Sequence, residues 1–316
     1  MVDFPMTELF DDSLYLVWLE RHLHPDGFAC PQCGSADRRR FRIQGHYDAY
    51  RCRACDGYYT LLSGTAFEGR RQRPATLVLL LRGVAKGESA ARLARELQLS
   101  RQTVHTLRQR LQTNVNNTAP IGVMDGQTFE VDELYQNAGG KVRRIPTSTI
   151  RHAGGPGTLW VKQPGHGTYN NDRPPIIHVI SRETGEERCW VVGHSDKATC
   201  QGILGEAVPR DAAIVYSDEQ CSYHGLDLPH ATVNHGQHEW ARDDDGNGVR
   251  EVHCNTCEGS GAGLRTFLRP FCGVHKAYLH LYVATYEALV NAKRVSPALI
   301  CRMCWPPKEP PHAYWI

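Results

Sequence analysis

The sequence predicts an α/β protein in which two small modules precede a mixed-sheet domain. Three observations predict this order: two C-x-x-C pairs lie near the amino terminus, a helical periodicity follows them, and beyond residue 127 short apolar runs alternate with helical segments. A chain of 316 residues is long enough for more than one domain. We expect an N-terminal helix and zinc ribbon at 1–68, a helix-turn-helix at 69–116 and the α/β domain at 117–316.

The composition argues against several classes of protein. No run of about 18 apolar residues occurs, which argues against a membrane span. The first residues are acidic, whereas a signal peptide begins with a basic region. Twelve cysteines in a chain without an export signal favour metal ligands or free thiols over disulfides. These features predict a cytoplasmic protein.

The cysteine spacing predicts a structural zinc site. Cys30, Cys33, Cys52 and Cys55 form two C-x-x-C pairs that are separated by about 18 residues, within the usual interval of a zinc ribbon. Each pair is expected on a tight turn, so that four thiolates converge on one tetrahedral ion. Such an ion would hold the module folded and would take no part in catalysis.

The amino-terminal third of the chain is basic. Between Arg21 and Asn116 the lysines and arginines exceed the acids by about ten, an asymmetry typical of nucleic-acid-binding proteins. Six arginines lie within or beside the ribbon: Arg38, Arg39, Arg40, Arg42, Arg51 and Arg53. They form either a solvated face or a set of phosphate contacts.

A helix-turn-helix is predicted after the ribbon. The apolar residues of 74–112 recur at a period near 3.6, and Ser100 is a good N-cap for a third helix that carries Val104, Leu107 and Leu111. The polar face of this helix suits the major groove of DNA, and it carries Arg101, Gln102, Thr103, His105 and Arg108. The alternative is a helical hairpin that serves packing or dimerisation.

The remainder of the chain predicts a mixed sheet. A linker at 113–122 is followed by strands near 127–134, 176–181, 188–193 and 212–218, with a long loop or arm at 139–172 and helices at 196–208 and about 255–294. Asp132, with Glu133 beside it, and Asp218 lie at the ends of two of these strands, where a strand interior would disfavour them. With a third acid from a helix they would hold Mg²⁺ or Mn²⁺, and a pair of such ions about 4 Å apart supports phosphodiester chemistry.

The segment VHCNTCEGSGAGLRTFL places Glu258 and Arg265 seven residues apart. On a helix that spacing puts both side chains on one face. Three glycines make the helix weak by intrinsic propensity, at about 1 kcal/mol each relative to Ala, so packing must stabilise it.

Several motifs together carry a family resemblance: FACPQCGS, VDELYQNAGGK, GHGTYNNDRPPIIHVISRETG, IVYSDE, HEWARDDDGNGVREVHCNTCEG and RPFCGVHK. They extend over nearly the whole chain, and the sequence resembles bacterial insertion-sequence transposases of the Merlin-related group. The resemblance implies a zinc ribbon, a helix-turn-helix and a DDE-type catalytic domain with an RNase H-like fold. It also implies two catalytic Mg²⁺ or Mn²⁺ ions and a structural Zn²⁺.

The resemblance also implies residue roles. The first two catalytic acids fall on Asp132 and Asp218, and the third position falls on Glu258 or Asn255, of which we favour Glu258 because it is ionised at neutral pH. A basic residue that holds the DNA backbone falls on Arg265. One departure is Gly261, where the family pattern has Trp.

Two further groups of residues are possible metal sites by their sequence patterns. The run Asp243, Asp244 and Asp245 shares its spacing with calcium loops but lacks the flanking helices of an EF-hand, so a solvated turn is the alternative. Cys254, Cys257, Cys301 and Cys304 form two further C-x-x-C pairs, although more than 40 residues separate them.

The predicted function is that of a transposase. It would bind the terminal inverted repeats of an insertion sequence as double-stranded DNA, cleave 3′ strand ends and join them to target DNA. Because two ends must be held together, we expect a homo-oligomer, associated with the nucleoid and with no membrane. The alternatives are a DNA-binding regulator with a decayed catalytic domain and a metal-dependent nuclease without strand joining.

Overall fold

The computed structural model describes residues 11–137, 167–170, 172–219, 221–223, 225–234 and 237–307. Most of the loop expected at 139–172 lies outside these residues. The helices are α1 (Asp12–Leu23), α2 (Pro74–Ala85), α3 (Ala90–Glu96), α4 (Arg101–Asn117), α5 (Lys197–Ala207), α6 (Asn255–Leu268), α7 (Lys276–Ala292) and α8 (Pro297–Cys304). The strands are β1 (Arg38–Gln44), β2 (Tyr47–Cys52), β3 (Tyr58–Thr60), β4 (Thr128–Tyr135), β5 (Pro175–Ser181), β6 (Glu187–Val191), β7 (Ile214–Asp218) and β8 (His230–Val233).

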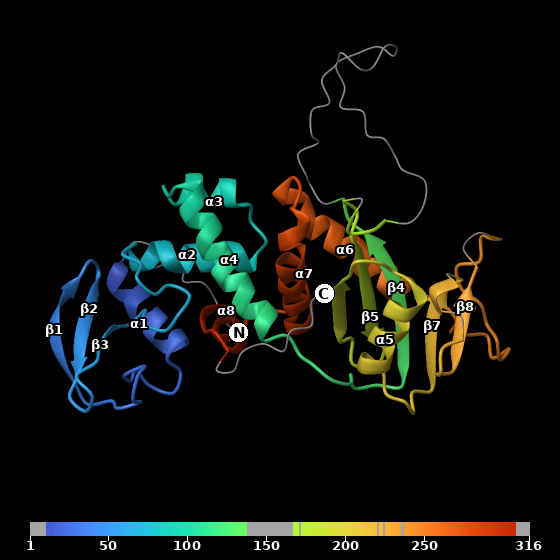
Figure 1. Ribbon diagram of the computed structural model, residues 1–316, viewed down its shortest axis with the longest axis horizontal. Helices are drawn as coiled ribbons and strands as arrows, with labels where there is room; N and C mark the ends of the chain where they lie inside the picture. Colours follow the sequence, from blue (N-terminus) through green and yellow to red (C-terminus); the bar gives the residue numbers. More distant parts are fainter. Residues whose placement is uncertain are drawn as a thin grey trace, which may run out of the picture.

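The described residues form a mixed α/β protein with two sheets. Figure 1 shows the three-stranded sheet at one end, the helices α2 to α4 beside it, α7 near the middle and the five-stranded sheet beyond. The small sheet is antiparallel in the order β1-β2-β3, and α1 packs against α2 beside it. The predicted combination of a four-cysteine module and a mixed α/β region is confirmed.

The helical prediction for 74–112 holds closely. Ser89 and Ser100 begin α3 and α4, and each hydroxyl accepts a backbone N–H three residues on. Gln98 joins these two helices with a positive φ of 53°. The apolar faces of α2, α3 and α4 then bury Leu77, Leu93 and Leu107 in one core.

The five-stranded sheet has the order β6-β5-β4-β7-β8. Its central strand β4 pairs antiparallel with β5 and parallel with β7, and β8 adds parallel to β7. Alternation along β4 sends Phe129 and Val131 into a core with α5, whereas Leu134 enters a second core with α6 and α7. Helices therefore cover both faces of this sheet.

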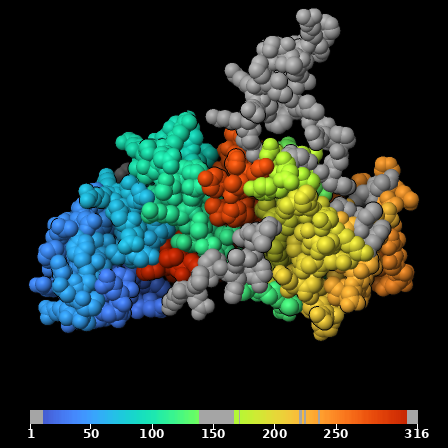
Figure 2. All heavy atoms as spheres, viewed as in Figure 1, coloured from blue at the N-terminus to red at the C-terminus, as the bar shows by residue number. Residues whose placement is uncertain are grey.

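The end of the chain returns to the amino-terminal core. Ala288 on α7, together with Leu299, Ile300 and Met303 on α8, packs with residues of α1, α2 and α4. On its other side α7 contributes Val283 to the core beneath the large sheet. Figure 2 shows the red atoms of this region between the teal helices and the yellow-green sheet region. The helix α7 thus contributes to both the amino-terminal core and the core of the large sheet.

Three details differ from the sequence prediction. The expected helix at 255–294 is interrupted at 269–275, where Cys272 and Gly273 both have positive φ values. The short elements β8 and α8 were not predicted.

None of the described helices is long and apolar enough to cross a membrane.

Candidate functional site

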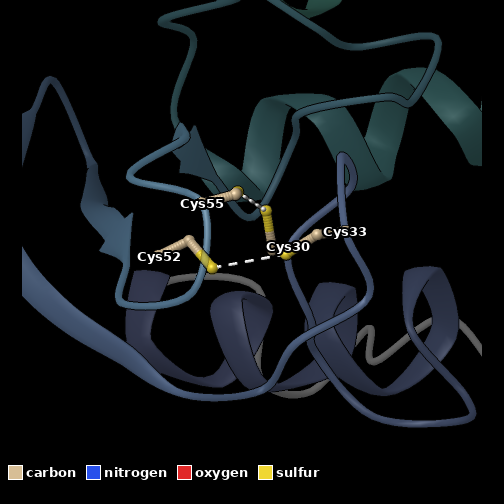
Figure 3. A group of neighbouring side chains, drawn as sticks. All are labelled: Cys30, Cys33, Cys52 and Cys55. Carbon is tan, nitrogen blue, oxygen red and sulfur yellow. Dashed lines mark hydrogen bonds between the residues drawn. The ribbon is translucent and has the colours of Figure 1, made fainter.

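The four ribbon cysteines converge as their spacing predicted (Figure 3). The Sγ atoms of Cys30 and Cys55 lie 3.7 Å apart, and those of Cys33 and Cys52 lie 3.5 Å apart. A tetrahedral ion with Zn–S bonds of about 2.3 Å requires sulfurs about 3.8 Å apart. The four thiols therefore fit a zinc ion without rearrangement.

Tight turns shape both cysteine pairs. The backbone N–H of Gly34 donates to the carbonyl of Cys30, and that of Asp56 donates to the carbonyl of Cys52. Gly34 and Asp56 both adopt positive φ, 74° and 56°, which closes each turn behind its second cysteine. The backbone N–H of Cys55 points at the Cys52 sulfur and lowers the pKa of that thiol to about 7, whereas the pKa values of the crowded Cys33 and Cys55 thiols are raised.

The acids that were predicted at strand ends form the second site, but only Asp218 ends its strand, because β4 continues three residues beyond Asp132 to Tyr135. Asp132 on β4 and Asp218 on β7 come together with Glu133, and carboxylate oxygens of all three lie within 4.8 Å of one another. Asp132 is on the face of β4 that carries Leu134, and Asp218 is on the face of β7 that carries Tyr216, so both point toward the α6 side. Glu133 points to the opposite side, where its Oε1 lies 3.8 Å from the Cys200 sulfur on α5.

The electrostatics of this cluster favour a cation. Burial, repulsion from Asp218 and repulsion from Glu258 raise the pKa of Asp132 to about 6. Burial and the neighbouring Asp218 and Asp132 likewise raise the pKa of Glu133 to about 8. Carboxylates that repel one another in a partly buried site are stabilised by a hard divalent ion. The donor set therefore fits Mg²⁺ or Mn²⁺.

A cleft of about 360 Å³ opens beside Asp132. It is lined by Asp132, Leu134, His178, Cys257, Glu258, Gly261 and Arg265. The structure thus brings Glu258 and Arg265 of α6 to the cleft that contains Asp132, although Glu258 is not part of the tight group of three acids. Asn255 is exposed as the first residue of α6 and is not among the lining residues.

His178 lines the cleft, and no local sequence pattern indicates it. It lies opposite Asp132 in the pairing of β4 with β5, and its ring lowers the pKa of that acid against the effect of burial. Its Nδ1 lies 3.1 Å from Oε1 of Glu187, and its Nε2 is buried without a hydrogen-bond partner among the described residues. A ligand bound in the cleft could supply that partner. Finding His178 requires the strand register, which the sequence does not provide.

The prediction that Arg108 contacts DNA is wrong. Its side chain is 1% exposed, donates to the backbone carbonyl of Glu88, and stacks with its guanidinium carbon 5.1 Å from the centre of the Phe271 ring. His105 is half-buried, and its ring is nearly perpendicular to that of Tyr278 on α7, with the ring centres 6.1 Å apart. Arg101 and Gln102 are exposed and Thr103 is half-buried at the start of α4. The helix therefore presents its first turn to solvent, and α7 covers its middle.

The two rival metal sites have different outcomes. The hypothesis of a second zinc site is wrong, because its two cysteine pairs lie apart. Cys304 is buried in the amino-terminal core, whereas Cys254 is buried beside Tyr216 and Val233 at the large sheet. Asp243 and Asp245 do come within 4.8 Å of each other and of Glu251. Asp243 accepts backbone N–H groups from Gly246 and Gly248, the pattern of the turn that was the alternative to calcium.

The glycines of α6 provide a matched test of packing at the cleft. A Cβ at Gly261 would meet no atom within 4 Å, whereas a Cβ at Gly263 would lie 2.5 Å from the Tyr286 hydroxyl oxygen, which donates to the Ser260 carbonyl. Gly261→Ala is expected to raise the free energy of unfolding by about 0.5–1 kcal/mol, because Ala restricts the unfolded chain and favours the helix. Gly263→Ala is expected to lower it. Thermal and denaturant unfolding of the two variants measure this, and equal effects would contradict the packing described.

Comparison with known proteins finds a curated relative over most of the chain. No family model matches the chain. Over 269 residues it is 27% identical to an uncharacterized protein in the transposable element ISH50 of Halobacterium salinarum, and the alignment covers 83% of this chain and 85% of that protein. A solved structure, a simian T-cell lymphotropic virus intasome in complex with PP2A regulatory subunit B56 gamma, matches 66% of each chain at 11% identity. Its TM-score of 0.27 is too low to support a conclusion. The chain is thus similar along most of its length to a protein of a transposable element.

Proposed function

We propose that the protein is a DDE-type transposase of the insertion-sequence class that its motifs resemble. The observation that carries the proposal is the convergence of Asp132 and Asp218 from neighbouring parallel strands, with Glu258 of α6 lining the cleft that contains Asp132. Similarity to a protein of a transposable element supports it independently.

The sheet supports an RNase H-like assignment of the catalytic domain. Such a sheet has three antiparallel strands and two more that are added parallel to the first strand, and β4, β5, β6, β7 and β8 have this order and these directions. In the proposal, residues 117–316 form this domain, although α8 also packs with the amino-terminal modules.

The residues of the cleft have distinct proposed roles. Asp132, which lines the cleft, and the neighbouring Asp218 would hold two divalent ions through carboxylate oxygens, and Glu258 lines the cleft from α6. When bound, two divalent ions activate a water or a 3′-hydroxyl and stabilise the leaving oxygen of the phosphodiester. Arg265, exposed on the same helix, binds a phosphate of the DNA strand and keeps it beside the acids. Cleavage and joining are then two in-line substitutions at phosphorus without a covalent enzyme intermediate.

Two surfaces of the amino-terminal modules suit double-stranded DNA. The first turn of α4 is exposed, as a recognition helix requires. On the ribbon, β1 is an edge strand with a register shift between Arg40 and Arg42. Phe41 at this shift is 48% exposed, and the guanidinium carbons of Arg42 and Arg51 lie 5.8 and 5.1 Å from its ring centre. Arg42 is exposed, whereas Arg51 is half-buried and paired with Asp56 at 2.6 Å. An exposed aromatic ring beside arginines favours contact with phosphates and bases.

The first turn of α4 gives a direct binding prediction. Replacing Arg101 and Gln102 together by Ala is expected to weaken binding to the terminal repeat by about 30-fold or more, because two base contacts are lost and each contributes about 1–3 kcal/mol. Fluorescence anisotropy with a labelled repeat duplex measures the loss. Arg294→Ala, which removes an exposed cation beyond the end of α7, is the control and should change affinity little. Equal losses in both variants would mean that α4 does not read the repeat.

The proposed activity is tested with the purified protein and a duplex that carries the terminal repeat from the DNA flanking the gene. Nicking at the repeat boundary and joining to a second duplex, both dependent on Mg²⁺ or Mn²⁺, are the expected results. Nicking without joining would indicate a metal-dependent nuclease. Repeat-specific binding without either reaction would favour a decayed, DNA-binding derivative, an alternative that the Gly261 departure supports. Because two ends must be held at once, the proposal includes a homo-oligomer in the DNA complex.

A further inference from the structure

A buried acid on β4 holds the start of the helix that carries Glu258. Glu130 is 0% exposed, and alternation places it on the same face of β4 as Asp132. Its Oε2 accepts the backbone N–H groups of Thr256 and Cys257 at 2.8 and 3.1 Å, and its Oε1 accepts the Thr256 hydroxyl at 2.8 Å. The residue before the helix, Cys254, provides no side-chain cap. Glu130 therefore does from a neighbouring strand what an N-cap residue normally does locally.

Arg182 completes this arrangement from the end of β5. Its Nε donates to Oε1 of Glu130 at 2.7 Å, and its two terminal nitrogens donate to the backbone carbonyls of Glu251 and His253, also at 2.7 Å. Its guanidinium carbon lies 4.3 Å from the centre of the Tyr216 ring on β7. One side chain thus contacts β4, β7 and the segment that leads into α6, using the fixed fork of donors that only Arg has.

The attachment points have a regular relation to the proposed catalytic acids. Glu130 precedes Asp132 by two residues on β4, Tyr216 precedes Asp218 by two on β7, and Thr256 precedes Glu258 by two on α6. On a strand, two residues correspond to the same face and about 6.6 Å. The Glu130–Arg182 ion pair therefore connects β4, β7 and α6, and on each of these elements it makes contact two residues before the proposed catalytic acid.

The helix that is held in this way is weak by itself. Gly259, Gly261 and Gly263 lower its intrinsic propensity, and its first turn has no local cap. An external acceptor at its amino terminus fixes both where the helix starts and how far it lies from the sheet. A buried carboxylate at that end is also favoured by the helix dipole.

We propose that Glu130 and Arg182 are positioning residues that set the separation of Glu258 from Asp132 and Asp218, and thereby the affinity of the cleft for divalent cations. The link to the cations rests on the proposed function. The prediction that Glu130 and Arg182 fix the start of α6 does not depend on it.

The test uses the full-length protein and three variants. Glu130→Gln keeps the size of the side chain but turns an amide donor toward groups that are themselves donors. Arg182→Lys keeps the charge but cannot reach Glu130 and both carbonyls at once. The matched control is Glu186→Gln, which breaks a partly buried ion pair with Arg188 at the far edge of the same sheet, where the two side chains lie 2.8 Å apart. Hydrogen exchange of the 252–262 segment and Mn²⁺ binding by electron paramagnetic resonance are measured for each.

The expected result is faster exchange in 252–262 and an Mn²⁺ dissociation constant raised about 10-fold to 100-fold in Glu130→Gln and Arg182→Lys, as for other residues that orient metal ligands. The control should change neither, whatever its thermal stability. Exchange in both variants that matches the control overturns the inference, as does faster exchange with unchanged Mn²⁺ affinity. If the unmodified protein neither binds Mn²⁺ nor cleaves DNA, the proposed function fails, and the exchange data alone then decide whether Glu130 and Arg182 hold α6.

Discussion

Asp132→Asn and Asp218→Asn are each expected to reduce strand cleavage at the terminal repeat by about 1,000-fold or more. Both carboxylates lie in the group that converges on the central strands β4 and β7, and an amide cannot provide the charge that holds two divalent ions. Several kcal/mol of transition-state stabilisation depend on such ions, and about 4 kcal/mol corresponds to a factor of about 1,000 in rate. Single-turnover cleavage of a labelled repeat duplex in Mg²⁺ measures the loss.

Asp211→Asn provides the control for these substitutions. Asp211 is an exposed acid shortly before β7 and is outside the cleft, so its replacement should leave the cleavage rate unchanged. Cleavage by Asp132→Asn at the rate of the unmodified protein would remove this acid from the reaction and, with it, the main support for the catalytic assignment.

Asp132→Asn should also change how the unfolding temperature depends on pH. Because the pKa of Asp132 is about 6 in the folded protein and 3.8 in its reference state, the folded protein holds this proton more tightly. Stability is therefore lost as the pH rises from about 4 to 6, and the deficit persists above that range. Without metal, Asp132→Asn should unfold at a higher temperature than the unmodified protein at pH 8 and at the same temperature near pH 4. Added Mg²⁺ should stabilise only the unmodified protein.

Local signals in the sequence predicted much of this structure. The two C-x-x-C pairs, the Ser100 cap and the apolar alternation of the strands that carry Asp132 and Asp218 each act over a few residues, and the structure has the corresponding elements. Asp132 lies within its strand and not at its end as predicted. A thiol pair or a capping hydroxyl needs only its neighbours in the chain, so spacing is sufficient to recognise it.

What the sequence did not provide are contacts between distant segments. Arg108 belongs to the polar pattern of α4, but Phe271, more than 160 residues later, packs over it. Glu130 and Arg182 are 52 positions apart and are recognised as a pair only when β4, β5 and α6 are assembled. His178 needed the register of β5 against β4. In each case a segment distant in the sequence packs over the polar residue and decides whether it faces solvent. The periodicity of one helix or strand does not identify which segment that is.

Removal of zinc is expected to unfold more than the ribbon. Cys30 and Cys52 are 2% exposed and belong to the same core as Leu62 of the ribbon, Tyr15 of α1 and Ile300 of α8. Since a small zinc module has too little apolar surface to fold without its ion, loss of the metal should also loosen the helices that pack on it. We expect one zinc per chain by elemental analysis. Chelation should lower the melting temperature and increase hydrogen exchange in α1 and α8 as well as in β1 to β3.

Two cysteine substitutions separate zinc binding from other effects of a lost thiol. Cys33→Ser removes one of the four converging sulfurs and should reproduce the effects of chelation, because a neutral hydroxyl is a poor zinc ligand. Cys272→Ser removes an exposed thiol in the turn before α7 and should leave zinc content and melting temperature unchanged. Full zinc content in Cys33→Ser would contradict the site. Exchange that rises in β1 to β3 alone would show that the helical core is stable without the ribbon, and the modules would then be independent folding units despite their shared core.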